Sequence, residues 1–395
     1  TRSTRTASQP GKCRMSEPAE QVAQSEAAIS RSTSHPALTT RFCELVRVRL
    51  PVVQTGMGWV SGATLTAATA NAGGLGILAS ATMTFDELDA AIAKVAGATD
   101  APFGVNLLPV QADLDKRLGL MEDRGVAVAS FAGPPSAKVV SRLNDAGIVT
   151  MVTVGARRHA EKMAGIGVQC IIAQGGEGGG HTGAVPTSLL VPDVADAVGA
   201  GTAAGPNGDG VIVLGAGGYR DGRGLVTALA QGADGIAMGT RFLLTAESGV
   251  PDDIKAIYLK TPVTGTVRTT AIDGAPQRVI ATDVISALES GIAPVRVANA
   301  LRNALRFRAL TGTSLKDLVQ TGLAMRKSQD LTWAQLAMAA NAPMLTKAAM
   351  VDGQAEVGIL PTGQVVGVID SLPTVAEVLG DIVTEAEATL ERLAG

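Results

Sequence analysis

The chain carries a histidine inside a run of glycines, and this combination is the first sign of chemistry in the sequence. Segment 173–187 reads AQGGEGGGHTGAVPT, with six glycines in the nine positions 175–183. Glycine lets a backbone lie close to a ligand, at a cost in conformational entropy. Histidine can act as a base or hydrogen-bond donor near neutral pH. We therefore predict that His181 is catalytic. A histidine that only caps a turn is the alternative, and Glu177 is compatible with bracing the loop or with reacting.

Two further glycine motifs predict a phosphate site. GAGG occupies 215–218, before a predicted helix, and MGT occupies 238–240. Glycine backbone and helix N-termini favour an anion such as phosphate. The alternative is that the glycines only form tight turns, but two such motifs after neighbouring strands favour phosphate. Asn106 and Gln174 end two other predicted strands, where their amides could hydrogen-bond a heterocyclic ring.

These residues need a scaffold, and one pattern recurs from 51 to 242. A short apolar run ends in glycine or a small polar residue, and a segment with helical spacing follows. Continuous apolar runs are typical of parallel strands covered on both faces. The runs are 51–58, 74–80, 103–108, 126–133, 148–155, 168–176, 211–218 and 235–242. Eight such units predict an α/β fold, a closed (β/α)8 TIM barrel with its site at the carboxyl ends of the strands. A doubly wound open sheet is the alternative.

Composition divides the rest of the chain. Residues 1–36 nearly lack large apolar side chains and are predicted to be a disordered tail, in which Met15 is the expected native start. Residues 37–272 would form the barrel, with a flexible connection at 199–210. Residues 273–350 are predicted to be a mainly helical cap inserted before 351–395, which would return to the barrel and end in a closing amphipathic helix.

Composition also narrows the function. The 395 residues are 46% hydrophobic, enough for a large core, and the net charge of -3 gives no sign of a nucleic-acid surface. We expect no membrane span and no signal peptide. Cys13, Cys43 and Cys170 lack metal-binding spacing, so no metal site is expected. A reducing, cytoplasmic location is the default.

Taken together, the motifs resemble those of the nitronate monooxygenase family, formerly called 2-nitropropane dioxygenases, which shares its fold with FMN-dependent enoyl-acyl-carrier-protein reductases. The family pattern QG-x-E-(A/G)-GGH-x-G appears at 174–183, and its phosphate elements appear as GAGG and MGT. The likeness covers about 40–250, with weaker similarity at 351–370. It implies a non-covalently held FMN, with His181 as the catalytic residue beside it. The flavin contacts it implies are Gln54, Thr55, Gly56, Met57, Asn106, Gln174, Gly179, Gly217, Gly218, Ala237, Met238, Gly239 and Thr240.

The resemblance leaves the substrate open. The first expectation is oxidation of an alkyl nitronate with O2. The alternative is reduction or dehydrogenation of an enoyl or acyl thioester of CoA or acyl-carrier protein, in steroid-ring or lipid catabolism, with NAD(P)H as a further reactant. The basic segment 296–327 is compatible with binding CoA phosphates or with a solvated helix face. A flavin-binding protein without turnover is a third interpretation, and a homodimer is a further expectation.

Overall fold

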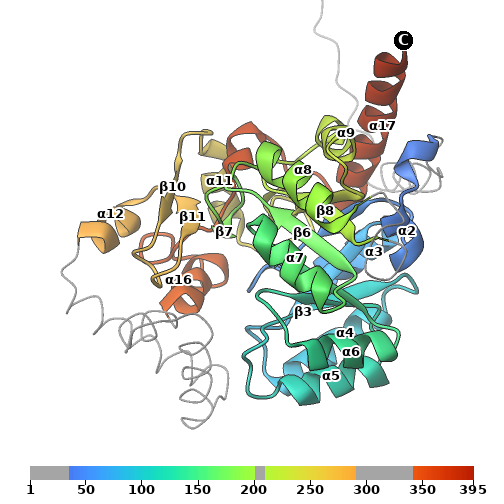
Figure 1. Cartoon of the computed structure of the whole chain (residues 1–395). Helices are drawn as coiled ribbons and strands as arrows, with labels where there is room; N and C mark the ends of the chain where they lie inside the picture. The colour runs from blue at the N-terminus through green and yellow to red at the C-terminus, as the bar shows by residue number, and fades with distance from the viewer. Residues whose placement is uncertain (1–34, 201–209, 291–340) are drawn as a thin grey trace, which may run out of the picture.

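A closed barrel of parallel strands forms the centre of the computed structural model, which describes residues 35–200, 210–290 and 341–395. The strands follow one another in the order β1-β2-β3-β4-β5-β6-β8-β9, with helices around them (Figure 1). They are β1 (Val52–Gln54), β2 (Leu75–Ala79), β3 (Phe103–Leu107), β4 (Val128–Phe131), β5 (Val149–Val154), β6 (Cys170–Gln174), β8 (Ile212–Ala216) and β9 (Gly235–Met238). The predicted (β/α)8 barrel is confirmed. The open sheet is excluded because β9 pairs with β1.

Helices cover the outside of the barrel. Those between or after its strands are α3 (Ala63–Asn71), α4 (Phe85–Ala96), α5 (Leu114–Asp123), α6 (Ala137–Asp145), α7 (Arg157–Gly165), α8 (Thr187–Val198), α9 (Gly222–Ala230), α10 (Thr240–Leu243), α11 (Asp252–Lys260) and α17 (Val375–Ala394). The others are η1 (Pro36–Leu38), α2 (Arg41–Val46), α12 (Asp283–Ser290), α16 (Asn341–Met350) and η2 (Gln364–Val368). Thr374 and Glu377 form a capping box that begins α17. This helix, which spans the range where a closing amphipathic helix was predicted, packs against α9 and α3.

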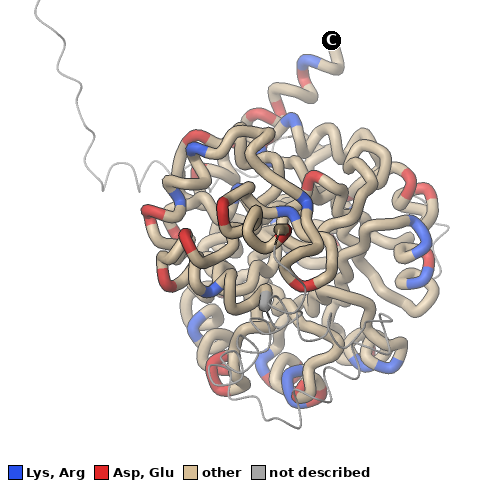
Figure 2. The backbone as a smooth tube through the Cα atoms, turned by 90° about the vertical axis from the view of Figure 1, so that its left-hand side faces the viewer, with Lys and Arg blue, Asp and Glu red and all other residues tan. Residues whose placement is uncertain are grey.

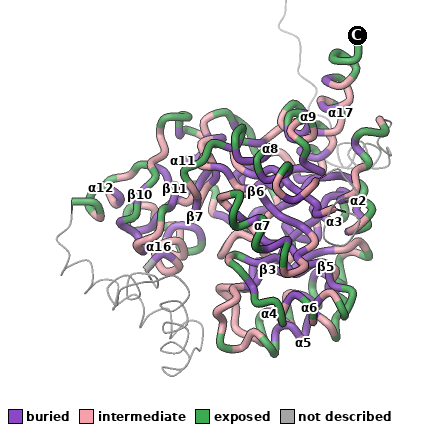
Figure 3. Tube along the Cα trace, viewed as in Figure 1, coloured by how far each residue is buried: buried purple, intermediate pink, exposed green. Residues whose placement is uncertain are grey.

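Two layers of apolar side chains hold the barrel together, and the strands at its centre are drawn as buried in Figure 3. One layer fills the interior, where Val53 and Ile77 belong to the same cluster as Phe42 of α2. Thr40, just before α2, donates from Oγ1 to Asp234 O at 2.6 Å, immediately before β9. Helix α2 therefore closes the end of the barrel where the strands begin. The other layer lies between strands and helices, and burial on both faces explains the continuous apolar runs.

A second, antiparallel sheet lies beside the barrel. Its strands are ordered β10 (Thr266–Thr269), β11 (Gln277–Ile280) and β7 (Gly180–His181), and β10, β11, α12 and α16 lie together at one side in Figure 1. The mainly helical prediction for 273–350 is wrong at β11, because Gln277 and Val279 are buried and the backbone pairs with strands on both sides. It is confirmed at α12 and α16.

Several predicted segments lie wholly or partly outside the described residues. They are the tail up to residue 34, the connection at 201–209 and the cap at 291–340. Residue 36 of the predicted tail begins η1. The predicted boundary after residue 272 falls between β10 and β11, so it separates two strands that pair with each other.

Basic and acidic residues are interspersed along the backbone tube in Figure 2. Within the described ranges, no helix combines the length and the apolar character needed to cross a membrane. The interior of the barrel, by contrast, is lined by apolar side chains from neighbouring strands.

Candidate active site

The predicted cofactor residues lie at the carboxyl ends of the barrel strands. They are 54–57 at and after β1, Asn106 on β3, Gln174 and Gly179 at and after β6, Gly217 and Gly218 after β8, and 237–240 at and after β9. Strands β6, β8, β9 and β1 are successive neighbours in the barrel. Residues far apart in the sequence therefore meet along one part of the rim, as the barrel prediction requires.

The end of β1 places Gln54 inside the rim. This residue is fully buried, and its Nε2 donates to Ser61 Oγ at 2.8 Å and to Ile77 O at 3.2 Å. Its Oε1 is buried and has no hydrogen-bond partner in the described part of the chain. Gly56 follows, where a Cβ would lie 2.4 Å from Asn106 Cβ. The absence of a side chain at Gly56 therefore lets Asn106 approach the loop after β1.

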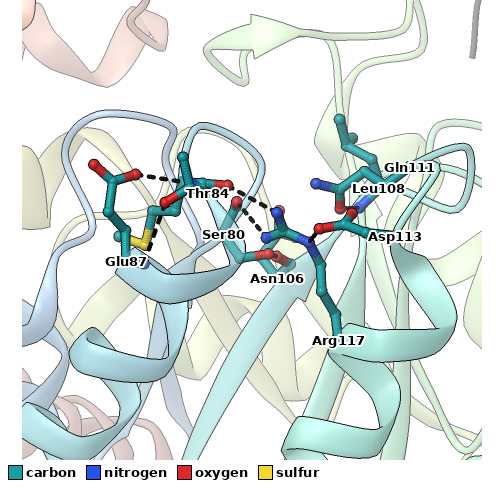
Figure 4. A network of polar contacts seen from close by, with 9 residues as sticks. Ser80, Thr84, Glu87, Asn106, Leu108, Gln111, Asp113 and Arg117 are labelled. Atoms are coloured by element: carbon teal, nitrogen blue, oxygen red, sulfur yellow. Dashed lines mark hydrogen bonds and ion pairs between the residues drawn. The ribbon is translucent and has the colours of Figure 1, made fainter. Parts of the chain in front are cut away.

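Asn106 is fixed by the polar network drawn in Figure 4. Its carbonyl oxygen accepts from Ser80 Oγ at 2.6 Å, and its Nδ2 donates to Ser130 O at 3.3 Å. The buried Arg117 guanidinium donates to Ser80 O at 3.0 Å and pairs with Asp113 at 2.8 Å. Because the buried cation is both paired and hydrogen-bonded, it can hold the ends of β2 and β3 in register.

The loop after β8 is made of residues in the left-handed conformation. Gly217 and Gly218 have φ angles of +97° and +85°, where a side chain would be strained. A Cβ on Gly217 would also lie 2.9 Å from Thr187 Oγ1, which is 3.0 Å from Gly217 O. Burial, with the charge of Glu177 as a smaller cause, raises the pKa of Tyr219 to about 12. The Tyr219 phenol therefore stays protonated and supports the turn.

The ends of β9 and β1 are joined directly. Thr55 donates to Met238 O from its backbone N at 3.1 Å and from Oγ1 at 3.3 Å. A Cβ on Gly239 would lie 3.3 Å from both Met57 Sδ and Thr55 Oγ1. The side chains of Ala237 and Met238 pack into the two apolar layers. At these two positions only the backbone is placed to meet a ligand.

The glycine-rich loop after β6 is braced from two sides. The Glu177 carboxylate accepts from Thr187 N at 2.9 Å and from Thr187 Oγ1 at 2.6 Å. Arg278 of β11 donates from Nε and Nη2 to Gly176 O at 3.0 and 2.9 Å. Of the two roles left open for Glu177, the structure shows the brace.

Residues 359–364, which we call the return segment, cover the same loop. Gly363 N donates to Thr240 Oγ1 at 3.0 Å, so the segment is tied to the end of β9. Gly179 packs against it so closely that a Cβ there would lie 2.5 Å from the carbonyl carbon of Thr362. The weaker sequence similarity at 351–370 thus belongs to a segment that touches the candidate site.

His181 lies on β7 rather than on the barrel. Its backbone pairs with Gln277 of β11, and its carbonyl oxygen accepts from Gln174 Nε2 at 2.8 Å. Its Nε2 lies 2.8 Å from Asp273 Oδ2. The side chain of His181 is 64% exposed and that of Asp273 only 6%. An accessible imidazole held by a buried carboxylate is suited to moving a proton.

Sequence reasoning missed Asp273 and Arg278, and it gave the return segment no role at the site. Asp273 is 92 residues from His181, and no local spacing relates the two. One signal was present: the Asp-Gly pair at 273–274 lies between two short runs, 266–269 and 277–280, which is typical of a hairpin.

Metal chemistry finds no support in the described ranges, where no group of three or more His, Cys, Asp or Glu side chains could hold an ion. Cys43 and Cys170 are buried free thiols, and burial raises the pKa of both. They are therefore protonated and poorly reactive at neutral pH. Cys13 lies outside the described residues.

Known proteins share this barrel and its sequence motifs. The model of the nitronate monooxygenase family matches residues 39–385. Two relatives are named (3aS,4S,5R,7aS)-5-hydroxy-7a-methyl-1-oxo-octahydro-1H-indene-4-carboxyl-CoA dehydrogenase. The one from Mycobacterium tuberculosis is 52% identical over 90% of this chain and 98% of its own, and the one from Rhodococcus jostii is 49% identical over the same shares. The solved structure of FabK from Thermotoga maritima is 30% identical, with a TM-score of 0.70 over 90% of this chain and 98% of its own.

The family match spans most of the chain, including the barrel, the glycine-rich loop and the return segment. Enzymes of this family and its structural neighbours depend on FMN. The chain therefore belongs to the nitronate monooxygenase family and is an FMN-dependent oxidoreductase.

Proposed function

We propose that this oxidoreductase dehydrogenates the CoA thioester of a bicyclic carboxylic acid of the indene type. The observation that carries the proposal is the exposed imidazole of His181, held by a buried carboxylate at the carboxyl end of the barrel. The two CoA-ester dehydrogenases support the substrate class, because their likeness to this chain extends along nearly their whole length.

The residues at the rim fit FMN, which has a phosphate at one end and a polar heterocycle at the other. The left-handed turn at Gly217 and Gly218, together with Gly239, would bring backbone N–H groups to the phosphate. The buried, unpartnered Oε1 of Gln54 would accept a hydrogen bond from a ring N–H. The amide of Asn106, fixed by its own network, would meet another polar edge of the ring.

In this proposal, His181 removes the proton from the carbon next to the thioester carbonyl, which makes that proton acidic. Bound FMN supplies the acceptor for the hydride that leaves the neighbouring carbon. A carbon–carbon double bond forms as the proton and the hydride depart. The chain's contribution is to hold the imidazole at the substrate and to keep it in one orientation through Asp273 and the β7–β11 pairing.

Oxidation of an alkyl nitronate with O2, the first expectation from the sequence, is the second candidate. The matched family model carries the nitronate monooxygenase name, and the same imidazole would serve a nitronate. Reduction of an enoyl thioester with NAD(P)H is the same thioester chemistry in the opposite direction. The basic segment 296–327, expected to contact CoA phosphates, lies outside the described residues.

The test is an anaerobic titration of the FMN-loaded protein, followed by the visible flavin band. Separate samples receive the indene carboxyl-CoA ester, ethyl nitronate and NADH. We expect the CoA ester to bleach the band, because it delivers two electrons. Bleaching by ethyl nitronate and not by the ester would contradict the proposal in favour of the second candidate. Bleaching by NADH but not by the ester would show that the enzyme works as a reductase.

Variants at two histidines show whether the imidazole takes part. His181→Gln should slow bleaching by about 10²- to 10⁴-fold, the usual contribution of an acid–base group, while FMN still binds. His159→Gln is the matched control, because His159 lies on the exposed face of α7. Equal bleaching rates in the two variants would rule out His181 as the base.

A further inference from the structure

We propose that Asp273 is a positioning residue that holds the His181 ring with the proton on Nε2, so that Nδ1 is the atom that accepts the substrate's proton. The part of this inference that concerns Nδ1 rests on the function proposed above. The part that concerns the tautomer rests on geometry alone.

Within the described part of the chain, the Asp273 carboxylate contacts two hydrogen-bond donors and one nitrogen of the His181 ring. Its Oδ2 lies 2.8 Å from His181 Nε2 and 2.5 Å from Gln277 Nε2. Its Oδ1 accepts from the backbone N of Ala275 at 3.1 Å. An ionised carboxylate can only accept hydrogen bonds, so a ring nitrogen that bonds to it has to carry the proton. His181 Nε2 must therefore donate.

A neutral imidazole carries a proton on only one nitrogen. If Nε2 donates to Asp273, Nδ1 is left with a lone pair. Nδ1 makes no hydrogen bond within the described part of the chain, and the His181 side chain is 64% exposed. Asp273 is itself buried in the turn between β10 and β11, so the carboxylate cannot turn away to solvent. The pair therefore presents Nδ1 as the free base.

The backbone around the pair is equally fixed. His181 lies opposite Gln277 in the β7–β11 register, and Thr182 N donates to Pro276 O at 3.1 Å. Gln277 thus holds His181 through its backbone and Asp273 through its side chain. The ring and the carboxylate are placed by the same short sheet.

The deciding variant is Asp273→Asn. Because Oδ1 faces the Ala275 N–H, the introduced amide would keep its oxygen there and turn its NH2 toward His181. The Gln277 amide, which donates to Oδ2 in the wild type, would turn over so that its oxygen accepts from this NH2. The ring nitrogen that donated must then accept, and the proton moves to Nδ1. We expect kcat to fall about 10²- to 10⁴-fold with KM and FMN affinity nearly unchanged. A purely structural role would instead weaken FMN binding or folding.

The tautomer is read directly from a long-range ¹H–¹⁵N spectrum of protein labelled with ¹⁵N-histidine, recorded at a pH where the ring is neutral and assigned with His181→Gln. Wild type should show a protonated Nε2 and a bare Nδ1, and Asp273→Asn the reverse. Asp283→Asn is the matched control, since Asp283 is exposed on α12, and it should give the wild-type spectrum.

A bare Nε2 in the wild type would overturn the inference, and so would an unchanged tautomer in Asp273→Asn. If that variant does not fold, the wild-type spectrum still decides. A reversed tautomer with an unchanged kcat would instead contradict the proposed role of His181 as the base and leave the positioning role of Asp273 standing. The two proposals therefore fail in different ways.

Discussion

Gly179 is a residue at which the candidate site has no room for a side chain. A Cβ at this position would lie 2.5 Å from the Thr362 carbonyl carbon, and neither backbone can yield as a flexible side chain would. Gly179→Ala should push the glycine-rich loop and the return segment apart, at about 1–3 kcal/mol. We expect a lower thermal midpoint and an FMN dissociation constant raised about tenfold or more, measured by flavin fluorescence.

Gly165→Ala is the control for this substitution. Gly165 ends α7, and a Cβ there would meet nothing within 4 Å. FMN affinity should stay at the wild-type value, and stability should stay the same or rise. Wild-type affinity in Gly179→Ala as well would show that the loop and the return segment can separate freely.

Residue types singled out His181 as a candidate but gave no sign of its partner Asp273. His181 could be singled out because the glycines around it are local in sequence, and the Glu177 brace was one of two roles left open. The Asp273 contact and the Arg278 hydrogen bonds to Gly176 could not be predicted. They depend on where a hairpin 90 or more residues later meets the loop, and no alignment-free pattern encodes that meeting.

Among the elements, helix α17 at the end of the chain packs on the outer helices of the barrel. Thr374 is the N-cap residue of α17. It forms a capping box with Glu377, in which each side chain accepts a hydrogen bond from the backbone N–H of the other residue. Thr374→Ala removes the acceptor for the Glu377 backbone N–H, and losing such a cap costs about 1 kcal/mol. We expect a lower midpoint in urea unfolding, with FMN affinity preserved in the folded protein because α17 packs on α9 and α3.

Thr384→Ala is the matched control on the same helix. Thr384 is exposed, and its hydroxyl donates to Gly380 O one turn earlier, its one hydrogen bond within the described residues. Because alanine is the better helix former, stability should stay equal or increase. If Thr384→Ala destabilised the protein as much as Thr374→Ala, the cap would not be the cause.

Strands of the barrel and strands of the small sheet differed in how well the sequence predicted them. All eight barrel strands fall inside their predicted runs, because burial on both faces makes each run continuously apolar. Strands β7, β10 and β11 are two to four residues long. Only the β7–β11 pairing joins segments distant in sequence, and none of the three strands forms the long apolar run that marks a barrel strand.

At the scale of the whole molecule, the outer helices are joined by ion pairs whose contribution depends on pH. Arg142 of α6 binds Glu122 of α5 in a two-pronged contact at 2.7 and 2.9 Å. The hydrogen bonds from Arg142 lower the pKa of Glu122 below its usual value. The folded state therefore favours the charged form, so the stabilisation is present above the unfolded-state pKa and is lost as pH falls through the folded-state pKa.

Glu122→Gln should lower the free energy of unfolding by about 0.5 kcal/mol near neutral pH, a usual value for an exposed pair. The difference from wild type should shrink toward zero as the pH falls from about 5 to 2, measured by urea unfolding at each pH. Asp115→Asn is the control, because Asp115 is 93% exposed and lies 3.4 Å from the same guanidinium. A constant difference at every pH would contradict an electrostatic origin.

The overall architecture was predictable because a closed barrel follows from counting repeated units. The border between barrel and cap was not, because the predicted boundary after residue 272 cuts through the β10–β11 pairing. Composition changes gradually along 266–290, whereas strand pairing begins at β10 and ends at β11. Hydrogen bonds between β10 and β11, rather than residue types, decide that residues 266–280 form one small sheet.

The pairing of β7 with β11 has a consequence for how such a protein can change over time. The residues expected to grip the flavin belong to the barrel, whereas the histidine and its carboxylate belong to a small sheet built largely from one later hairpin. Mutation and selection can therefore change the barrel and the small sheet independently of each other. Substitutions in the hairpin and in the turn at Asp273 can therefore change the substrate specificity while the cofactor site stays the same. Enzymes that catalyse different reactions can then descend from one ancestor and retain the same barrel.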